Sequence, residues 1–320
     1  MLEQLTAAWP LRRVLIAGSA DAMTRYAAAL LTALGAQTVC LPPDAGAFAL
    51  HRALSAGRIH AVLIPAAHAL FGDDDLPALL RSLFLLFGEI REAGVPLVIL
   101  CSDEDVYAPN QSVPADELAP LGGRTRAGMH QSIIQLAASG FSRGLMGDPV
   151  RTVICRHAPC LGSGHADTAQ YSAWCRAILQ NSTPVIEHPD TQGTFLHPLD
   201  AMLGALCLGA HHLLNPQDAG GIYNLGDVPK SRCANRSAWQ LLAAAQGSAR
   251  PCRHAHPPRL PARNLLDGSR ARALCGYRVQ LGARQALSFL MEHEKAQRIS
   301  EEAAAQTRLA QAQALLDMLS

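Results

Sequence analysis

The sequence predicts an α/β fold built on a parallel, doubly wound sheet, and two observations support this prediction. Short apolar runs alternate with longer segments in which apolar residues recur at three- and four-residue spacing, as in helices. One run, Pro96 to Cys101, is apolar throughout, which is typical of strands buried on both faces of a parallel sheet.

The first unit is a strand, a helix and a second strand within about 30 residues, the size of a βαβ unit. The apolar run from Arg13 to Gly18 predicts the first strand, and Gln37 to Leu41 predicts the second. Gly35 stands between them, where a glycine is expected to end a helix. The helix is indicated by apolar residues at helical spacing, namely Met23, Tyr26, Ala27, Leu30, Leu31 and Leu34.

The same alternation continues along the next hundred residues. Further strands are expected at His60–Pro65, Pro96–Cys101 and Arg151–Cys155. Helices are expected at Leu76–Ala93, before Gly94, and at Gly128–Ser139. The order predicts helices that cross back over a parallel sheet.

After about residue 165 the alternation weakens and loops rich in Pro, Gly and His appear. Helices are expected at Leu199–His212, Ala238–Gln246 and Ala283–Lys295, and the Ala-, Gln- and Leu-rich tail from Glu301 to Leu319 is also expected to be helical. This predicts a first domain over 1–165, a smaller lobe over 166–295 that is partly threaded back onto it, and a helical tail over 296–320.

Composition narrows the classes of partner. The chain has a net charge of +1 and only 5% aromatic residues, which argues against nucleic acid or an anionic membrane as partner. The sequence shows no membrane span, and its N-terminal segment lacks the basic-then-apolar order of a signal peptide. Nine cysteines without a disulfide-like rhythm predict reduced, mostly buried thiols in a cytoplasmic protein.

Seven short segments follow one another in order over roughly residues 12 to 290. They are Val14-Leu15-Ile16-Ala17-Gly18, Ala66-Ala67, Ser102 to Tyr107, Arg156 with Leu161-Gly162-Ser163-Gly164, Phe195-Leu196-His197-Pro198-Leu199-Asp200, Tyr223-Asn224-Leu225-Gly226, and Leu266-Asp267 with Leu274-Cys275-Gly276-Tyr277. In this order they resemble landmarks of the NAD-dependent epimerase/dehydratase family, the extended short-chain dehydrogenases. The resemblance implies a Rossmann-like fold with a smaller C-terminal substrate lobe, NAD or NADP as cofactor, and a nucleotide-sugar-like substrate.

The resemblance places the cofactor beside the first helix. The family's three glycines correspond to Gly18, Asp21 and Thr24, so only the first is kept. A carboxylate at a helix N-terminus caps its N–H groups but repels a phosphate, and we favour Asp21 as an internal substitute for the bound anion. By the same resemblance Ala66 lies on the cofactor side, and Asp44 either reaches a ribose or is an exposed turn carboxylate.

The family's catalytic Ser, Tyr and Lys positions correspond to Asp103, Arg126 and His130. No Tyr occurs from 108 to 170 and no Lys before 230, so a Tyr-Lys pair is absent there. An arginine keeps its charge near neutral pH, whereas a histidine can exchange a proton. Asp103 and His130 are therefore one candidate acid/base couple. The alternative, which we favour, is a polar cluster at the mouth of an unused cleft, formed by Asp103, Arg124, Arg126 and His130.

A metal site is not expected. Cys252, His254 and His256 alternate, but flanking prolines indicate a loop, and beyond the distant Cys233 no fourth ligand stands at metal-site spacing.

Two functions follow from these observations. One is a divergent NAD(P)-dependent epimerase, dehydratase or reductase acting on a nucleotide-linked sugar. The other is a non-catalytic relative that keeps the fold for ligand binding or subunit partnering. The resemblance also implies a homodimer formed through the helices expected at 76–93 and 128–139.

Overall fold

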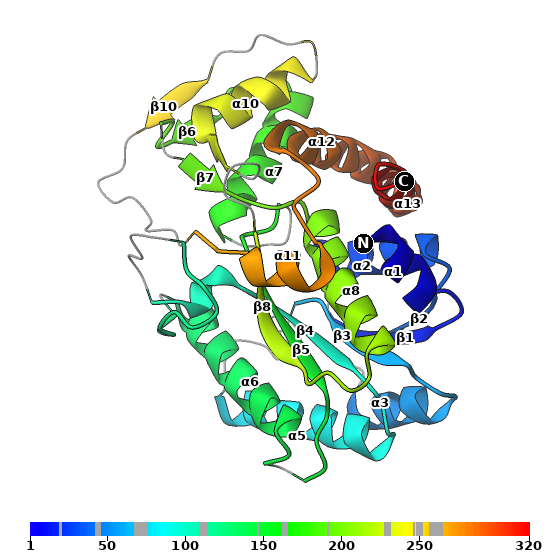
Figure 1. Ribbon diagram of the computed structural model, residues 1–320. Helices are drawn as coiled ribbons and strands as arrows, with labels where there is room; N and C mark the ends of the chain where they lie inside the picture. Colours follow the sequence, from blue (N-terminus) through cyan, green and yellow to red (C-terminus); the bar gives the residue numbers. More distant parts are fainter. Residues whose placement is uncertain are drawn as a thin grey trace.

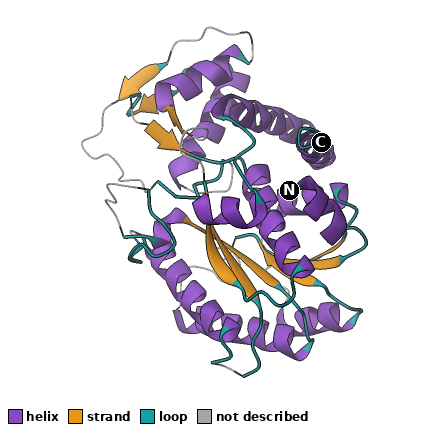
Figure 2. Cartoon of the chain, viewed as in Figure 1, coloured by secondary structure: helices purple, strands orange, loops and turns teal. Residues whose placement is uncertain are grey.

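The computed structural model has the predicted α/β fold, with a Rossmann-like central sheet and a smaller lobe above one edge of it (Figure 2). The structure describes residues 1–18, 21–41, 46–66, 76–108, 114–123, 125–145, 147–161, 166–190, 192–226, 232–245, 247, 252–255 and 265–320.

Six parallel strands form the central sheet in the order β2-β1-β3-β4-β5-β8. Their bounds are β1 (Arg13–Ala17), β2 (Gln37–Leu41), β3 (Ala61–Ile64), β4 (Val98–Asp103), β5 (Thr152–His157) and β8 (Gly221–Leu225). Strands β3, β4 and β5 are buried along their whole length, which confirms the interpretation of the uninterrupted apolar run in β4.

Helices cover both faces of this sheet (Figure 1). One face carries α1 (Leu2–Ala8), α2 (Ala22–Ala33) and α8 (Pro198–Leu214), which pack on one another. The opposite face carries α3 (Gly46–Ser55), α5 (Leu76–Glu92) and α6 (Arg126–Ser142). Gly35 follows α2 with a φ of +76°, a left-handed conformation that confirms its expected place at the helix end.

The second lobe stands beyond the carboxyl ends of the strands (Figure 1). It consists of α7 (Ala166–Leu179), α10 (Asn235–Ala244), α12 (Ala283–Ile299), a parallel pair β6 (Val185–Glu187) and β10 (Arg253–Ala255), and an antiparallel pair β7 (Gln192–Thr194) and β9 (Arg232–Ala234). Helix α11 (Ser269–Cys275) packs on α8 and β8. Asp200 at the start of α8 fixes the following segment, because its carboxylate accepts the backbone N–H groups of Gln280 and Leu281, each at 2.9 Å.

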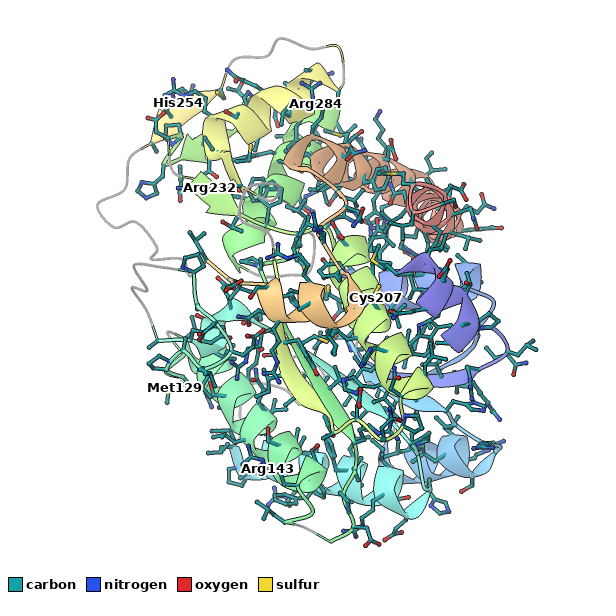
Figure 3. The ribbon with its side chains drawn as sticks, viewed as in Figure 1. Met129, Arg143, Cys207, Arg232, His254 and Arg284 are labelled. Atoms are coloured by element: carbon teal, nitrogen blue, oxygen red, sulfur yellow. The ribbon has the colours of Figure 1, made fainter. Side chains whose placement is uncertain are left out.

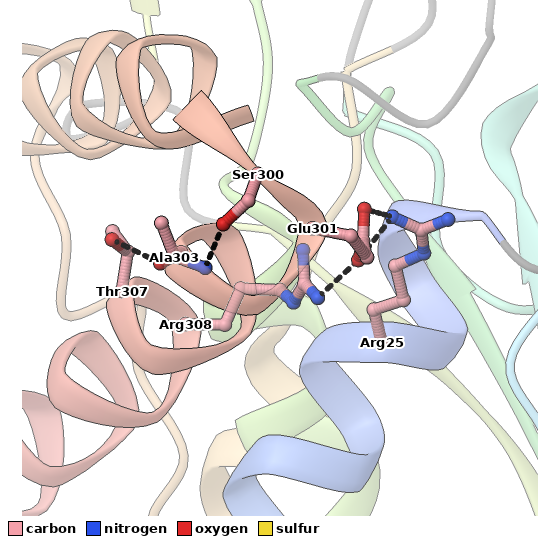
Figure 4. A network of polar contacts seen from close by, with 6 residues as sticks. All are labelled: Arg25, Ser300, Glu301, Ala303, Thr307 and Arg308. Carbon is pink, nitrogen blue, oxygen red and sulfur yellow. Dashed lines mark hydrogen bonds and ion pairs between the residues drawn. The ribbon is translucent and has the colours of Figure 1, made fainter. Parts of the chain in front are cut away.

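The C-terminal tail is the helix α13 (Glu301–Asp317), which packs along α2 and α12. Glu301 accepts hydrogen bonds at 2.8 Å from both Arg25 of α2 and Arg308 of α13 (Figure 4). Tyr26 donates a hydrogen bond of 2.7 Å to Gln311. The tail is therefore part of the folded body, and its helix begins at Glu301, as predicted, after the N-cap Ser300.

Most predicted elements are confirmed with boundaries shifted by a few residues. Strand β4 continues to Asp103, and α6 is longer than expected at both ends. The helices α1, α3, α7 and α11 and the three-residue strands of the second lobe were not predicted. Among the described residues, no helix has both the length and the apolar character needed to cross a membrane.

Candidate functional site

The strand order reverses at β1, which has β2 on one side and β3 on the other. In open parallel sheets, ligands bind at such a reversal, beyond the carboxyl ends of the strands. Gly18 follows β1 at this place, and the Pro65–Ala66 turn follows β3. A Cβ atom on Gly18 would stand 2.5 Å from Thr24 Oγ1 and 3.4 Å from Pro65 Cδ, so a glycine is needed there. The structure thus brings Gly18, Thr24 and the turn at Ala66 together, while Asp44 lies outside the described residues.

Asp21 is the N-cap of α2. Its carboxylate accepts the backbone N–H of Thr24 at 2.8 Å. This occupies one of the N–H groups at the helix start and sets a negative charge against the positive end of the helix dipole. A dinucleotide pyrophosphate in the place usual for this fold would need those N–H groups and would face the carboxylate. The residues at the start of α2 therefore do not fit a pyrophosphate in that place.

The carboxyl end of β4 carries two buried polar residues, Ser102 and Asp103. Gln131 of α6 holds both: its Oε1 accepts from the Ser102 hydroxyl and from the Asp103 N–H, and its Nε2 donates to the Asp103 carboxylate at 2.7 Å. Asp103 also accepts the N–H of Asp105 and so begins the short 3-10 turn η1 (Glu104–Val106). Sequence reasoning missed Gln131, although its spacing of four from Gln135 was a usable signal for a shared helix face.

The predicted positions Arg126 and His130 lie on the same helix in different surroundings. Arg126 is the first residue of α6 and is exposed, whereas the His130 side chain is buried. Thr125 caps the helix by accepting the N–H of Gly128, and its hydroxyl donates to Asp105. A Cβ atom at Gly128 would collide with the Asp105 backbone, so the first turn of α6 is pressed onto η1.

Arg156 of β5 is the centre of a buried hydrogen-bond network and is only 2% exposed. Its Nε donates to Gln135 at 2.8 Å, and its Nη1 donates to the Tyr107 hydroxyl at 2.9 Å. Tyr107 in turn donates to Asn224 of β8 at 2.6 Å. The backbone N–H of Asn224 donates to Glu117 at 2.7 Å. The network connects β5, β8 and α6 with Tyr107 and Glu117, and it gives Arg156 a structural role.

All five tyrosines of the chain lie within the described residues, and all are buried. Burial raises the pKa of four of their phenols, those of Tyr26, Tyr107, Tyr223 and Tyr277. The fifth, Tyr171, donates to Asn235 in the second lobe. The chain has two lysines, Lys230 and Lys295, and neither belongs to α6. None of these four phenols has the lowered pKa of an acid/base tyrosine, and within the described residues α6 carries no Tyr-Lys pair.

The cysteine and histidine candidates form no metal centre among the described residues. Cys252 Sγ lies 3.3 Å from His254 Nε2 at the start of β10, and His256 lies outside the described residues. No group of three possible ligands among His, Cys, Asp and Glu was found in the part of the chain that the structure describes. The nine cysteines form no disulfide in the structure, and seven of them are buried, which confirms the prediction that most are buried.

Among known proteins, the chain is similar only to solved structures, in fold. No protein-family model matches the chain, and no curated protein does. Solved structures match over most of the chain. Three of them are each 17% identical to it, with 99% of their own chain covered. UDP-glucose 4-epimerase of Thermus thermophilus with NAD covers 88% of this chain at a TM-score of 0.71. The dTDP-glucose 4,6-dehydratase DesIV of Streptomyces venezuelae, with NAD and TYD bound, covers 91% at 0.70. RMD of Pseudomonas aeruginosa with NADPH covers 89% at 0.71.

This likeness shows the fold. At such identity it confirms the Rossmann-like architecture expected from the seven segments, and the site must be judged on its own residues.

Replacing Arg156 by Met should destabilise the protein by about 2 to 4 kcal/mol, because Gln135 and Tyr107 would lose their buried donor. Urea unfolding followed by circular dichroism measures this. Arg143→Met, at the exposed end of α6, is the matched control and should change little (Figure 3). Equal effects of the two changes would contradict the structural part given to Arg156.

Stability should also fall on acidification. Burial lowers the pKa of His197 to about 3 and those of His212 and His293 to about 4, so all three are neutral when folded. The unfolded chain takes up their protons below about pH 6.5, so this stability is complete above that pH and is lost as pH falls toward about 4.

The urea midpoint at pH 7 and at pH 5 measures this loss. His293→Gln should show a smaller fall than the wild type. His254→Gln, on the exposed strand β10, should fall as the wild type does (Figure 3). A fall that is the same in all three proteins would exclude His293 as a contributor.

Proposed function

We propose that this chain is a non-catalytic relative of the NAD-dependent nucleotide-sugar epimerases and dehydratases, which uses their fold to bind a ligand or a partner subunit. The observation that carries the proposal is the state of the tyrosines. All five are buried in the body of the protein, and burial raises the pKa of four of them. An acid/base phenol needs the opposite environment, an accessible position and a lowered pKa.

The start of α2 supports the same proposal. NAD or NADP is the cofactor expected from the resemblance, and it would meet Asp21 at the helix end, together with Gly18, Thr24 and Ala66. Because the carboxylate already caps the helix, binding of a dinucleotide in the usual pose is disfavoured. We propose a cytoplasmic protein, in keeping with its free, mostly buried thiols.

An altered enzyme is the second candidate, and the likeness to NAD- and NADPH-bound structures over about nine-tenths of the chain favours it. In this form of the proposal a nucleotide-sugar-like substrate lies near the carboxyl end of β4. Asp103 and His130 then form a replacement acid/base couple, and Arg126 belongs to the polar rim. Histidine is the residue type suited to proton exchange near neutral pH.

Calorimetric titration with NAD(H) and NADP(H) separates the two candidates. The wild type should show no tight, stoichiometric binding, because a phosphate would meet the Asp21 carboxylate. Asp21→Asn keeps a capping side chain and removes the charge, so it should bind at least about tenfold more tightly than the wild type. Asp190→Asn, a surface change in the second lobe, is the control. Tight binding by the wild type would overturn the non-catalytic proposal.

If the wild type does bind the cofactor, turnover of nucleotide sugars by His130→Ala tests the acid/base couple. Loss of turnover with cofactor affinity retained would support it, and unchanged turnover would remove His130 from the site.

We further propose a homodimer formed through α5 and α6. Helix α5 turns much of its apolar surface inward, and its buried residues are Leu79, Leu83, Leu86, Phe87 and Ile90. Its outer side still exposes Phe84 and Leu85, by 39% and 47%. On α6, Leu136 is 64% exposed and Met129 is 58% exposed, at the surface near the start of the helix (Figure 3). An apolar surface on two adjacent helices favours burial against a second copy.

Light scattering at micromolar concentration should give twice the chain mass of 34.0 kDa. Leu136→Arg should shift the mass toward the monomer, because it places a charge in the proposed interface. Leu118→Arg, at a site 89% exposed and outside both helices, should leave the mass unchanged. A monomeric wild type would contradict the dimer.

A further inference from the structure

A cavity of about 170 Å³ lies between the first turns of α2, the start of α8 and the helix α12. Its polar lining is contributed by three separate parts of the chain, namely Asp21 and Arg25 of α2, His197 before α8, and His293, Glu294 and Gln297 of α12. The cavity adjoins the helix end at which this fold usually binds a phosphate, and the helix α12 bounds it on the other side.

His293 brings an unsatisfied polar atom to this cavity. The residue is only 8% exposed, and its Nδ1 has no hydrogen-bond partner among the described residues. Leaving a buried imidazole nitrogen without a partner costs free energy, so a bound polar group is the expected partner.

His197 contributes a hydrogen-bond donor, its Nε2–H, because its backbone contact fixes the tautomer. Its Nδ1 accepts the backbone N–H of Leu199 at 3.2 Å, so the proton of the neutral ring is on Nε2. Burial lowers the pKa of His197 to about 3 and that of His293 to about 4, so both rings are uncharged near neutral pH. The two histidines therefore offer hydrogen bonds without adding positive charge.

Two charged side chains of the cavity lining, Arg25 and Glu294, already have partners of opposite charge within the protein. Both Glu301 oxygens accept from Arg25, at 2.8 and 2.9 Å, and Glu301 also accepts from Arg308 (Figure 4). Arg176 stands 3.7 Å from Glu294. The carboxylates of Asp21 and Glu294 oppose an anion. A metal ion is disfavoured as well, because no three-ligand group exists among the described residues.

We propose that this cavity binds a neutral, hydroxyl-rich ligand of the size of a monosaccharide or cyclic polyol. Hydroxyl groups donate and accept, and so they match a lining that combines carboxylate acceptors with imidazole and guanidinium donors. A cavity of about 150 Å³ holds a bare six-membered ring such as benzene. This cavity is slightly larger and partly open, so the ring can lie inside it while some of its hydroxyl groups reach the opening. The cavity shares Asp21 and Tyr26 with the residues discussed above. The ligand contacts proposed here are those of His197, His293 and Gln297, which the proposed function does not use.

NMR of the histidine ring nitrogens tests the proposal with the intact chain. The probes are glucose, galactose, mannose and myo-inositol, with inorganic phosphate as the charged comparison. At least one of the four neutral probes should shift the His293 ring nitrogens in a saturable way. Two variants should weaken this binding at least about tenfold, the effect of losing one or two hydrogen bonds. His293→Phe fills the cavity, and its binding is read from the ring nitrogens of His197, because the His293 signal is lost. Gln297→Trp blocks the cavity from an exposed position.

His254→Phe, on β10, is the matched control and should bind as the wild type does. Three results would overturn the proposal: no shift of His293 with any neutral probe, a shift that is unchanged in Gln297→Trp, or a saturable response to phosphate alone. The NAD titration described above gives a separate result, so failure of either proposal can be recognised independently.

Discussion

The buried guanidinium of Arg156 is the constraint on which this end of the sheet depends. It stands on β5 and binds α6 through Gln135 and the region after η1 through Tyr107, which in turn binds Asn224 on β8. A buried charge with several hydrogen bonds can be satisfied in very few arrangements, so the network sets the relative positions of these elements. The carboxyl ends of β4, β5 and β8 are therefore closed by a structural polar layer, in which Gln131 also holds Asp103.

The polar groups at the start of α2 also find their hydrogen-bond partners within the chain. Asp21 supplies the negative charge that favours the helix end, and α13 supplies a carboxylate, Glu301, to Arg25. The C-terminal helix α13 thus packs on α2, the element that would otherwise face a cofactor. The charged side chains around Arg156 and at the start of α2 thus have partners within the chain, in keeping with the proposal of a neutral ligand.

Local patterns predicted elements with clear apolar spacing or a helix-forming composition, and they missed several short elements. The buried run of β4 and the helical spacing in α2 and α5 were sufficient for the sheet and its covering helices. The strands of the second lobe have three residues each, too few to show a period of two. On α6, the side chain that hydrogen-bonds the end of β4 is that of Gln131, one position after the predicted His130. This register is a difference of one residue along the helix. It depends on the cap at Thr125 and the contact of Gly128 with η1, which are set by packing.

The sequence by itself determined the alternation of the central strands with α2, α5 and α6. It also determined the single glycine kept after β1, the carboxylate at the start of α2 and the absence of a Tyr-Lys pair on α6. These follow from composition and short-range spacing, which act over a few residues. Only the tertiary structure decided that all five tyrosines are buried, that Arg156 joins four elements, and that residues from the start of α2, the start of α8 and α12 enclose one cavity. Such contacts join residues far apart in the chain, and their geometry is set by how the helices and strands pack rather than by any local pattern.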